Sequence, residues 1–144
     1  MPNRENERKS YALAQNLSNF RILIIDDETD TNSQSFLKGI LHGLGASCDT
    51  ARSGEEALDL VDHNKSYDIY FINRILPGIN GIQMTKIVKG KENNPDDVSV
   101  IMFSAEELVE EELKKVGVDK FLRMPLTPTA VINSIHDCIF PSNE

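Results

Sequence analysis

The chain has 144 residues, enough for one domain with a substantial core, and its composition, 40% apolar and 26% charged, is typical of globular proteins. A formal net charge of −8 and a pI of about 4.9 argue against direct nucleic-acid binding, which requires a basic surface. No apolar run is long enough to cross a membrane, and the polar N-terminus lacks a secretory signal. Cys48 and Cys138 are isolated and are expected to be small core residues. We therefore expect a cytoplasmic protein.

Residues 1–20 are expected to form an N-terminal extension. The first ten residues are charged or polar, so a disordered or loosely docked tail is one interpretation. The folded domain is expected to span residues 21–141. The alternative for the extension is a short helix with a single apolar stripe made of Tyr11, Leu13, Ala14 and Leu17.

Five short apolar stretches alternate with five helical patterns in this domain. Each stretch is bounded by turn-forming residues, as expected of a strand buried on both faces. This βα alternation predicts a parallel sheet with right-handed crossovers and helices on both faces. The expected strands are 21–26, 46–51, 67–73, 98–103 and 118–122. The expected helices are 30–43, a segment capped by Ser53, a segment after Gly81, 106–116 and 127–139.

Polar residues follow several strands at their carboxyl ends. Asp26 and Asp27 follow the first strand, Asn73 ends the third, and Ser104 follows the fourth. Ligands bind at this edge of an open α/β sheet, so we expect the first and third strand ends to lie side by side and form one pocket. A divalent cation such as Mg²⁺ would relieve the repulsion between the adjacent carboxylates. The structural alternative is that both acids cap the following helix.

The span from about residue 21 to 140 resembles the receiver domain of two-component response regulators. Each matching motif is weak alone, but together in this order they make the resemblance specific. The resemblance implies a flavodoxin-like, doubly wound α/β fold with a five-stranded parallel sheet of order 2-1-3-4-5 and five helices. The motifs are Ile24–Glu28, Gly54–Leu58, Tyr67–Asp68 with Leu76–Gly81, Ile101–Ala105 and Phe121–Leu126.

The resemblance also implies roles for residues at the strand ends. In that family an aspartate ending strand three accepts a phosphoryl group from a histidine kinase, and a hydroxyl and a lysine contact that group. Ser104 occupies the position of the hydroxyl, and Phe121 that of an aromatic residue that moves inward as the domain switches. The Met124–Pro125 bond would be a cis peptide bond, as the corresponding bond generally is in the family.

Two residues depart from the family pattern where the chemistry occurs. Asn73 occupies the phospho-acceptor position, and Met124 occupies the lysine position. A neutral amide does not form an acyl phosphate, and a thioether carries no charge to pair with a phosphate. By resemblance, the metal ligands would be Asp26, Asp27, Asn73 and the backbone carbonyl of Ile75. Because an amide replaces a carboxylate in this set, we expect at most weak Mg²⁺ binding and no other cofactor.

Three functions compete. The first is a non-enzymatic pseudo-receiver that binds protein partners independently of phosphorylation. The second is an ordinary phospho-accepting receiver of a phosphorelay that carries an engineered Asp-to-Asn change at position 73. Loss of an acid together with a lysine leaves the formal pocket charge unchanged, so Asn73 and Met124 favour a natural pair of changes. The third and least favoured is a Mg²⁺-dependent phosphohydrolase built on Asp26 and Asp27.

The resemblance also indicates the class of partner. Signalling proteins, such as a histidine kinase or an output protein, are expected to bind. The face formed by the fourth and fifth helices with the fifth strand would support a homodimer, as it commonly does in the family. Neither nucleic acid nor a membrane is expected as a partner.

Overall fold

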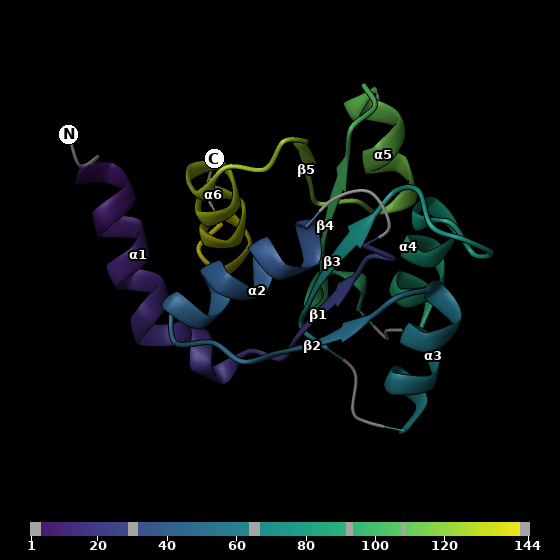
Figure 1. Ribbon diagram of the computed structural model, residues 1–144, viewed down its shortest axis with the longest axis horizontal. Coiled ribbons are helices and arrows are strands. Elements are labelled where there is room, and N and C mark those ends of the chain that lie inside the picture. Colours follow the sequence, from purple (N-terminus) through teal and green to yellow (C-terminus); the bar gives the residue numbers. More distant parts are fainter. Residues whose placement is uncertain (1–3, 29–31, 64–66, 92–93, 108, 142–144) are drawn as a thin grey trace.

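The computed structural model describes residues 4–28, 32–63, 67–91, 94–107 and 109–141. Within them, five parallel strands form one sheet of order β2-β1-β3-β4-β5, with helices on both faces (Figure 1). The predicted parallel sheet and its strand order are therefore confirmed. The strands are β1 Ile22–Ile25, β2 Cys48–Ala51, β3 Ile69–Asn73, β4 Ser99–Ser104 and β5 Lys120–Arg123.

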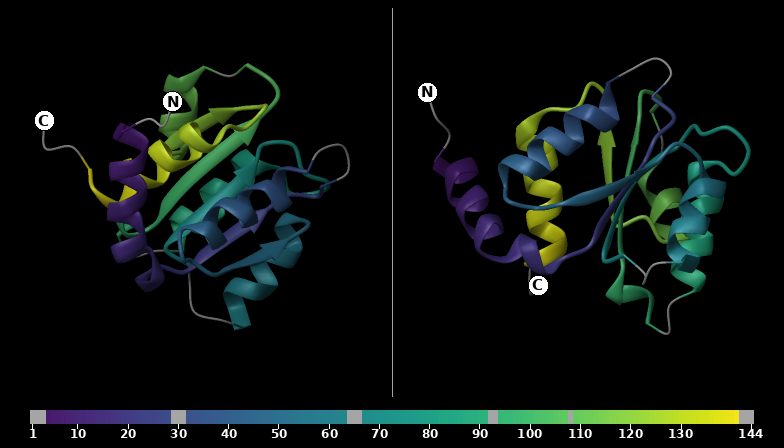
Figure 2. Two further views of the ribbon diagram at one scale, coloured as in Figure 1. Left: turned by 60° about the vertical axis from the view of Figure 1, so that its left-hand side comes forward. Right: turned by 60° about the horizontal axis from the view of Figure 1, so that its bottom comes forward.

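Six α-helices surround the sheet in this part of the chain. The five predicted helices correspond to α2–α6, and α1 is an additional helix that precedes β1. Helices α2 and α6 cover one face and α3, α4 and α5 the other, while α1 lies outside α6 (Figures 1 and 2). The helices are α1 Arg4–Asn16, α2 Ser33–Gly43, α3 Gly54–His63, α4 Gly81–Gly90, α5 Glu110–Val116 and α6 Pro128–Ile139; two 3₁₀ turns are Leu17–Asn19 and Pro95–Asp97.

The central strands are buried on both faces because their side chains alternate between two cores. In β1, Ile22 and Ile24 join the core beneath α2 and α6, while Leu23 and Ile25 join the core beneath α3, α4 and α5. All four are at most 1% exposed. Burying an aliphatic side chain contributes about 1.5–3 kcal/mol, so these strands hold the two layers together. No described helix is both long enough and apolar enough to cross a membrane.

Two expected helix features differ in the structure. The helix expected from Glu106 begins at Glu110, because the amide N–H of Glu106 instead donates to Ser104 Oγ at 3.1 Å and shapes a turn. In α1, Leu13 is buried, but Tyr11 is 71% exposed and Ala14 is also exposed, so half of the predicted stripe was wrong. The residues just before Ser33, where the second expected helix begins, lie outside the described residues.

The start of α4 packs directly against the end of β3. Asn80 caps α4 through a capping box: its Oδ1 accepts from the Gln83 amide at 2.9 Å, and the Gln83 side chain accepts from the Asn80 amide at 3.0 Å. A Cβ on Gly81 would lie 2.5 Å from the Asn73 carbonyl oxygen and 2.6 Å from Arg74 Cα. Only glycine permits this approach, which fixes the backbone at the end of β3.

Replacing Gly81 with alanine should therefore destabilise the fold, because backbone atoms would have to move. We expect Gly81→Ala to lower the free energy of unfolding by about 1–3 kcal/mol, measured by urea denaturation. Gly39→Ala is the matched control, since Gly39 lies in α2 with no atom within 4 Å of its added Cβ. That change should raise stability by about 0.5–1 kcal/mol. Equal shifts in the two variants would contradict a steric role for Gly81.

Candidate functional site

The ends of β1 and β3 lie side by side at the carboxyl edge of the sheet. The parallel register pairs Ile25 with Ile72, so the next residues, Asp26 and Asn73, are neighbours. Asn73 Nδ2 donates a hydrogen bond to Asp26 Oδ1 at 2.9 Å. The expected pocket therefore begins with a direct contact between an acid and an amide.

The Asn73 side chain is held from both sides. Its Nδ2 donates to Asp26, and its Oδ1 accepts from the amide N–H of Ile75 at 3.0 Å. The reversed amide would set a carbonyl oxygen against the carboxylate and an NH₂ group against the Ile75 N–H, so both bonds would be lost. The network thus fixes the amide with its NH₂ group toward the acid and its oxygen toward the β3–α4 loop.

Asp26 is a buried acid, and only one of its two carboxylate oxygens accepts hydrogen bonds from the described residues. Its side chain is 1% exposed, and Oδ1 accepts from Asn73 and, at 3.4 Å, from the amide of Glu28. Its Oδ2 has no hydrogen-bond partner among the described residues. Burial raises the pKa of Asp26, although the two hydrogen bonds act in the opposite direction. The pocket therefore holds an acid that is costly to keep ionised.

The acid that caps α2 is Glu28, which sequence reasoning had not assigned. Its Oε1 accepts from the amide N–H of Ser35 at 3.0 Å and from the Ser35 hydroxyl at 2.8 Å, and these bonds lower the pKa of Glu28. Glu28 adopts φ 57°, an uncommon conformation for a non-glycine residue. Asn32, at the formal cap position, makes no side-chain cap bond. Helix capping therefore does not account for Asp26.

Gln34 is a second positioning residue that the sequence did not suggest. It is buried in α2, and its Nε2 donates to the backbone oxygens of Asp26 at 3.1 Å and Ala51 at 3.3 Å. These bonds tie the start of α2 to the ends of β1 and β2. The helical spacing placed Gln34 in α2, but no sequence signal indicated which backbone groups it would reach.

Ser104 is the last residue of β4, which lies on the far side of β3 from β1 and Asp26. It is 1% exposed, and its Oγ accepts from the Glu106 amide, which shapes the β4–α5 turn and leaves the O–H as a donor. Phe121 is half-buried and packs against the core beneath α3, α4 and α5. Ile75 is 52% exposed, and its amide N–H is engaged by Asn73. Ser104 and Ile75 therefore lie at the carboxyl edge of the sheet, whereas Phe121 lies within β5, beside Met102.

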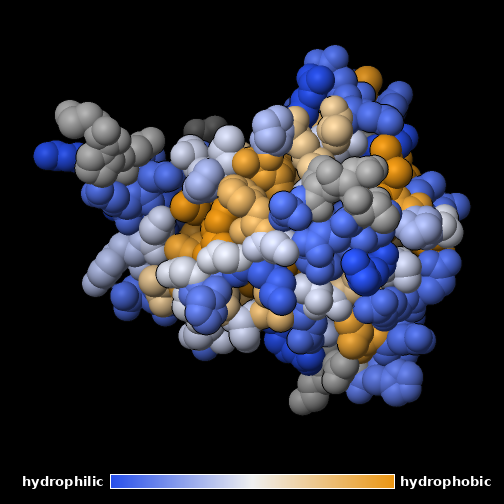
Figure 3. Space-filling model, viewed as in Figure 1, coloured by the Kyte–Doolittle hydropathy of each residue, from blue (hydrophilic) through white to orange (hydrophobic). Residues whose placement is uncertain are grey.

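Met124, which directly follows β5, makes that side of the site apolar. Its Sδ lies 4.0 Å from the Ser33 hydroxyl, and the bond to Pro125 is cis. An apolar depression of about 240 Å³ adjoins it (Figure 3, above α2 in the view). The depression is lined by Asn32, Ser33, Phe36, Met124, Pro125 and Leu126.

Two arginines flank the site, and each pairs with an acid of the β4–α5 loop. Arg74 follows Asn73, and its guanidinium lies 3.7 Å from Glu106. Arg123 precedes Met124, and it lies 3.0 Å from Glu107. Both side chains are therefore paired with the acidic β4–α5 loop, which leaves the strand edge dominated by the acids and the Asn73 amide.

The residues at this edge do not fit Mg²⁺ in the observed arrangement. Mg²⁺ requires oxygen ligands in near-octahedral geometry, whereas Asn73 turns its NH₂ group toward Asp26. Among the described residues, no group of three or more His, Cys, Asp or Glu side chains is placed to hold a metal ion. The amide hydrogen occupies the side of Asp26 from which an Asn73 oxygen would have to coordinate.

The sequence and the architecture are similar to those of known proteins. The profile described as the response regulator receiver domain matches residues 22–136. The two-component response regulator 24 of Arabidopsis thaliana is 27% identical over 125 residues, which cover 85% of this chain and 86% of that protein. The transcriptional regulatory protein CpxR of Escherichia coli K12 is 31% identical over 117 residues, which cover 80% of this chain but only 47% of CpxR.

A solved structure shows the same arrangement of elements. The receiver domain of the Francisella response regulator 1452 superposes with a TM-score of 0.70 and is 30% identical. The superposition covers 83% of this chain and 96% of that domain. Together with the strand order and the polar residues at the carboxyl edge, these matches identify the chain as a member of the response regulator receiver domain family.

Proposed function

We propose that this receiver domain binds its protein partners without being phosphorylated and is not an enzyme. The hydrogen bond between Asn73 and Asp26 is the observation that carries this proposal. Phosphoryl transfer to the position of Asn73 needs an anionic oxygen as nucleophile. Here the amide is neutral, and its oxygen is directed to the Ile75 N–H.

The surroundings of Asn73 support the same conclusion. A phosphoryl group at this edge would need a cation to balance its charge. Met124 offers a thioether, and Arg74 and Arg123 are engaged by acids of the β4–α5 loop. With the Asn73 NH₂ group directed at Asp26, Mg²⁺ binds at most weakly. No lysine or arginine among the described residues is buried at this edge, and this supports a function without phosphotransfer or phosphohydrolase activity.

The partner is a signalling protein of the two-component type. The relatives are response regulators, and one of them, CpxR, is a transcriptional regulatory protein about twice as long as the matched segment. By analogy, a histidine kinase or an output protein in the cytoplasm is the class of partner that recognises this domain. Recognition then depends on the fixed shape of the folded domain.

A phospho-accepting receiver is the second candidate, and the retained frame of the site favours it. Asp26, Ser104 and the cis Met124–Pro125 bond all stand at the expected edge. An aspartate at position 73 would lie directly beside Asp26. The two candidates differ in the residue that stands naturally at position 73, and sequencing the source gene distinguishes them.

The chain should gain no phosphoryl group when incubated with acetyl phosphate and Mg²⁺, because the Asn73 amide is not a nucleophile. The double variant Asn73→Asp/Met124→Lys should gain the mass of one phosphoryl group, measured on the intact protein by mass spectrometry. Met124→Lys alone is the control and should stay unmodified. A phosphoryl group on Asn73 of the unaltered chain would refute the proposal.

Metal affinity should depend on the same position. Asn73→Asp replaces an N–H donor with an anionic oxygen, so we expect the Mg²⁺ dissociation constant to fall by about tenfold or more. Isothermal titration calorimetry measures this change. Adding Asp26→Asn to that variant should abolish the gain. Equal affinity of the unaltered chain and Asn73→Asp would show that the amide does not obstruct the metal.

Asp26 should cost stability, since burial raises its pKa above the ordinary value of 3.8. The folded chain then binds this proton more tightly than the unfolded chain, so the penalty is absent below pH 3.8 and grows as the pH rises toward the folded pKa. Asp26→Asn should therefore raise the free energy of unfolding at pH 7 by about 1 kcal/mol, measured by urea denaturation with EDTA present. The gain should shrink toward pH 4.

The exposed residue Asp59 provides the matched control for this measurement. Asp59→Asn removes the same charge from the surface of α3 and should change stability by less than about 0.5 kcal/mol. If Asp26→Asn were destabilising at pH 7, the buried carboxylate would be fully compensated by its hydrogen bonds.

A further inference from the structure

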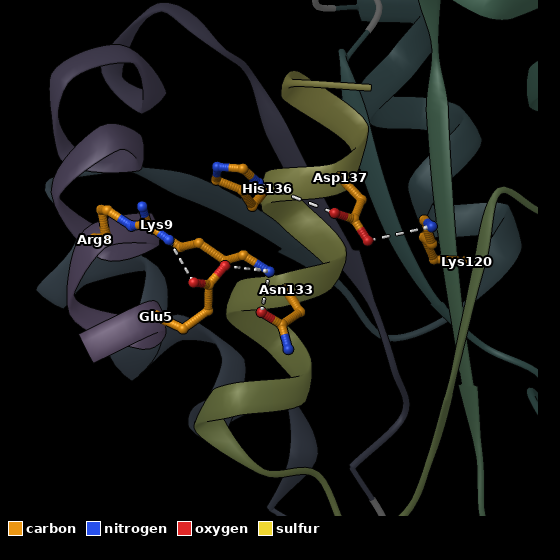
Figure 4. Close-up of polar contacts among 7 residues, drawn as sticks. All are labelled: Glu5, Arg8, Lys9, Lys120, Asn133, His136 and Asp137. Carbon is orange, nitrogen blue, oxygen red and sulfur yellow. Dashed lines mark hydrogen bonds and ion pairs between the residues drawn. The ribbon is translucent and has the colours of Figure 1, made fainter. Parts of the chain in front are cut away.

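Helix α1 lies along the outer side of α6, and the first half of their contact is polar. Asn6 Nδ2 donates to Thr129 Oγ1 at 3.2 Å, and Lys9 Nζ donates to Asn133 Oδ1 at 2.9 Å. Residue numbers rise together along both helices, so the two run parallel (Figures 2 and 4). We call Asn6, Lys9, Thr129 and Asn133 the polar seam.

The second half of the contact is apolar. Leu13 and the next inward residue, Leu17, are both 0% exposed and belong to the same buried cluster as Val131 and Ile135 of α6. By contrast, no residue from 4 to 12 is buried, although all of them are described. The helix is therefore anchored by fully buried leucines at its C-terminal end, whereas only partly buried residues and the hydrogen bonds of the polar seam hold its N-terminal end.

Charges within α1 weaken the hold of the seam. Lys9 Nζ also lies 3.7 Å from Glu5 Oε1, and Glu5 pairs with Arg8 (Figure 4). Lys9 can therefore keep a charged partner within α1 when its bond to Asn133 is broken. The Asn6–Thr129 bond is exposed, so water readily replaces it, whereas the Lys9 side chain is 21% exposed and its bond to Asn133 is partly buried.

We propose that α1 is a strap with a fixed end and a releasable end. Leu13 and Leu17 stay in the core while residues 4–12 detach from α6 at the polar seam. A segment of this length does not hold helical structure alone in water, so the released part unfolds. Detachment frees the side chains of Thr129 and Asn133 from their hydrogen bonds to α1, and it does so independently of Asn73.

Amide hydrogen exchange of the full chain, followed by NMR, tests this proposal. The amides of residues 8–16 should exchange at least about tenfold faster than the amide of Phe20, because their helical hydrogen bonds use carbonyls of the released residues 4–12, whereas the Phe20 amide donates to the Leu17 carbonyl. Lys9→Met should speed exchange of residues 8–12 by a further three- to tenfold, roughly the effect of one lost hydrogen bond. Exchange of the Phe20 amide should not change.

Two more variants separate release at the seam from ordinary fraying of a helix end. Asn133→Ala, made on α6, should reproduce the effect of Lys9→Met, and the double variant should add little because both changes remove one bond. Glu7→Gln, at an exposed position of α1, should leave the rates unchanged. The proposal is overturned if Asn133→Ala has no effect, or if residues 8–12 and the Phe20 amide exchange together in every variant. None of these outcomes depends on phosphorylation or metal binding.

Discussion

The hydrogen bond from Asn73 to Asp26 is the interaction on which the character of this domain depends. A carboxylate buried to 1% exposure needs compensation, and the fold of the family places its third strand end beside it. In this chain the compensation comes from an N–H donor of the protein itself. A neutral donor satisfies part of the charge permanently, whereas a metal ion would bind and leave. The Asn73 side chain therefore occupies the position next to Asp26 Oδ1.

This bond requires a precise backbone at the end of β3. The parallel register sets the two residues at the same height, and the close packing of Gly81 against the Asn73 carbonyl fixes the strand end. The Ile75 amide then selects one orientation of the Asn73 side chain. On the other side, Gln34 ties the carbonyl of Asp26 to α2. Packing by elements far from the chemistry thus decides what the pocket can bind.

The sequence predicted the sheet because short apolar stretches and turn residues are local signals, and the strand edge followed from parallel topology. It did not predict the orientation of the Asn73 amide, which depends on a backbone N–H two residues away. Nor did it distinguish Glu28 from Asp26 as the cap of α2, since adjacent acids look alike until the chain turns. In α1, helical spacing allowed Tyr11 to join Leu13, but only the position of α6 decides which side is inward.

A receiver that carries no phosphoryl group must obtain any change of state from another source. A ligand shifts a conformational equilibrium only by its differential affinity for the two states. In this domain Asn73 and Asp26 hold each other in one arrangement, and the Ser104 Oγ accepts from the Glu106 amide in the β4–α5 turn. The carboxyl edge of the sheet therefore has few groups whose arrangement a ligand could change. The contact between α1 and α6 is different in kind, because exposed polar groups close it at one end while apolar groups anchor the other. If this domain changes state, the physical contrast between those two ends favours α1 as the moving part.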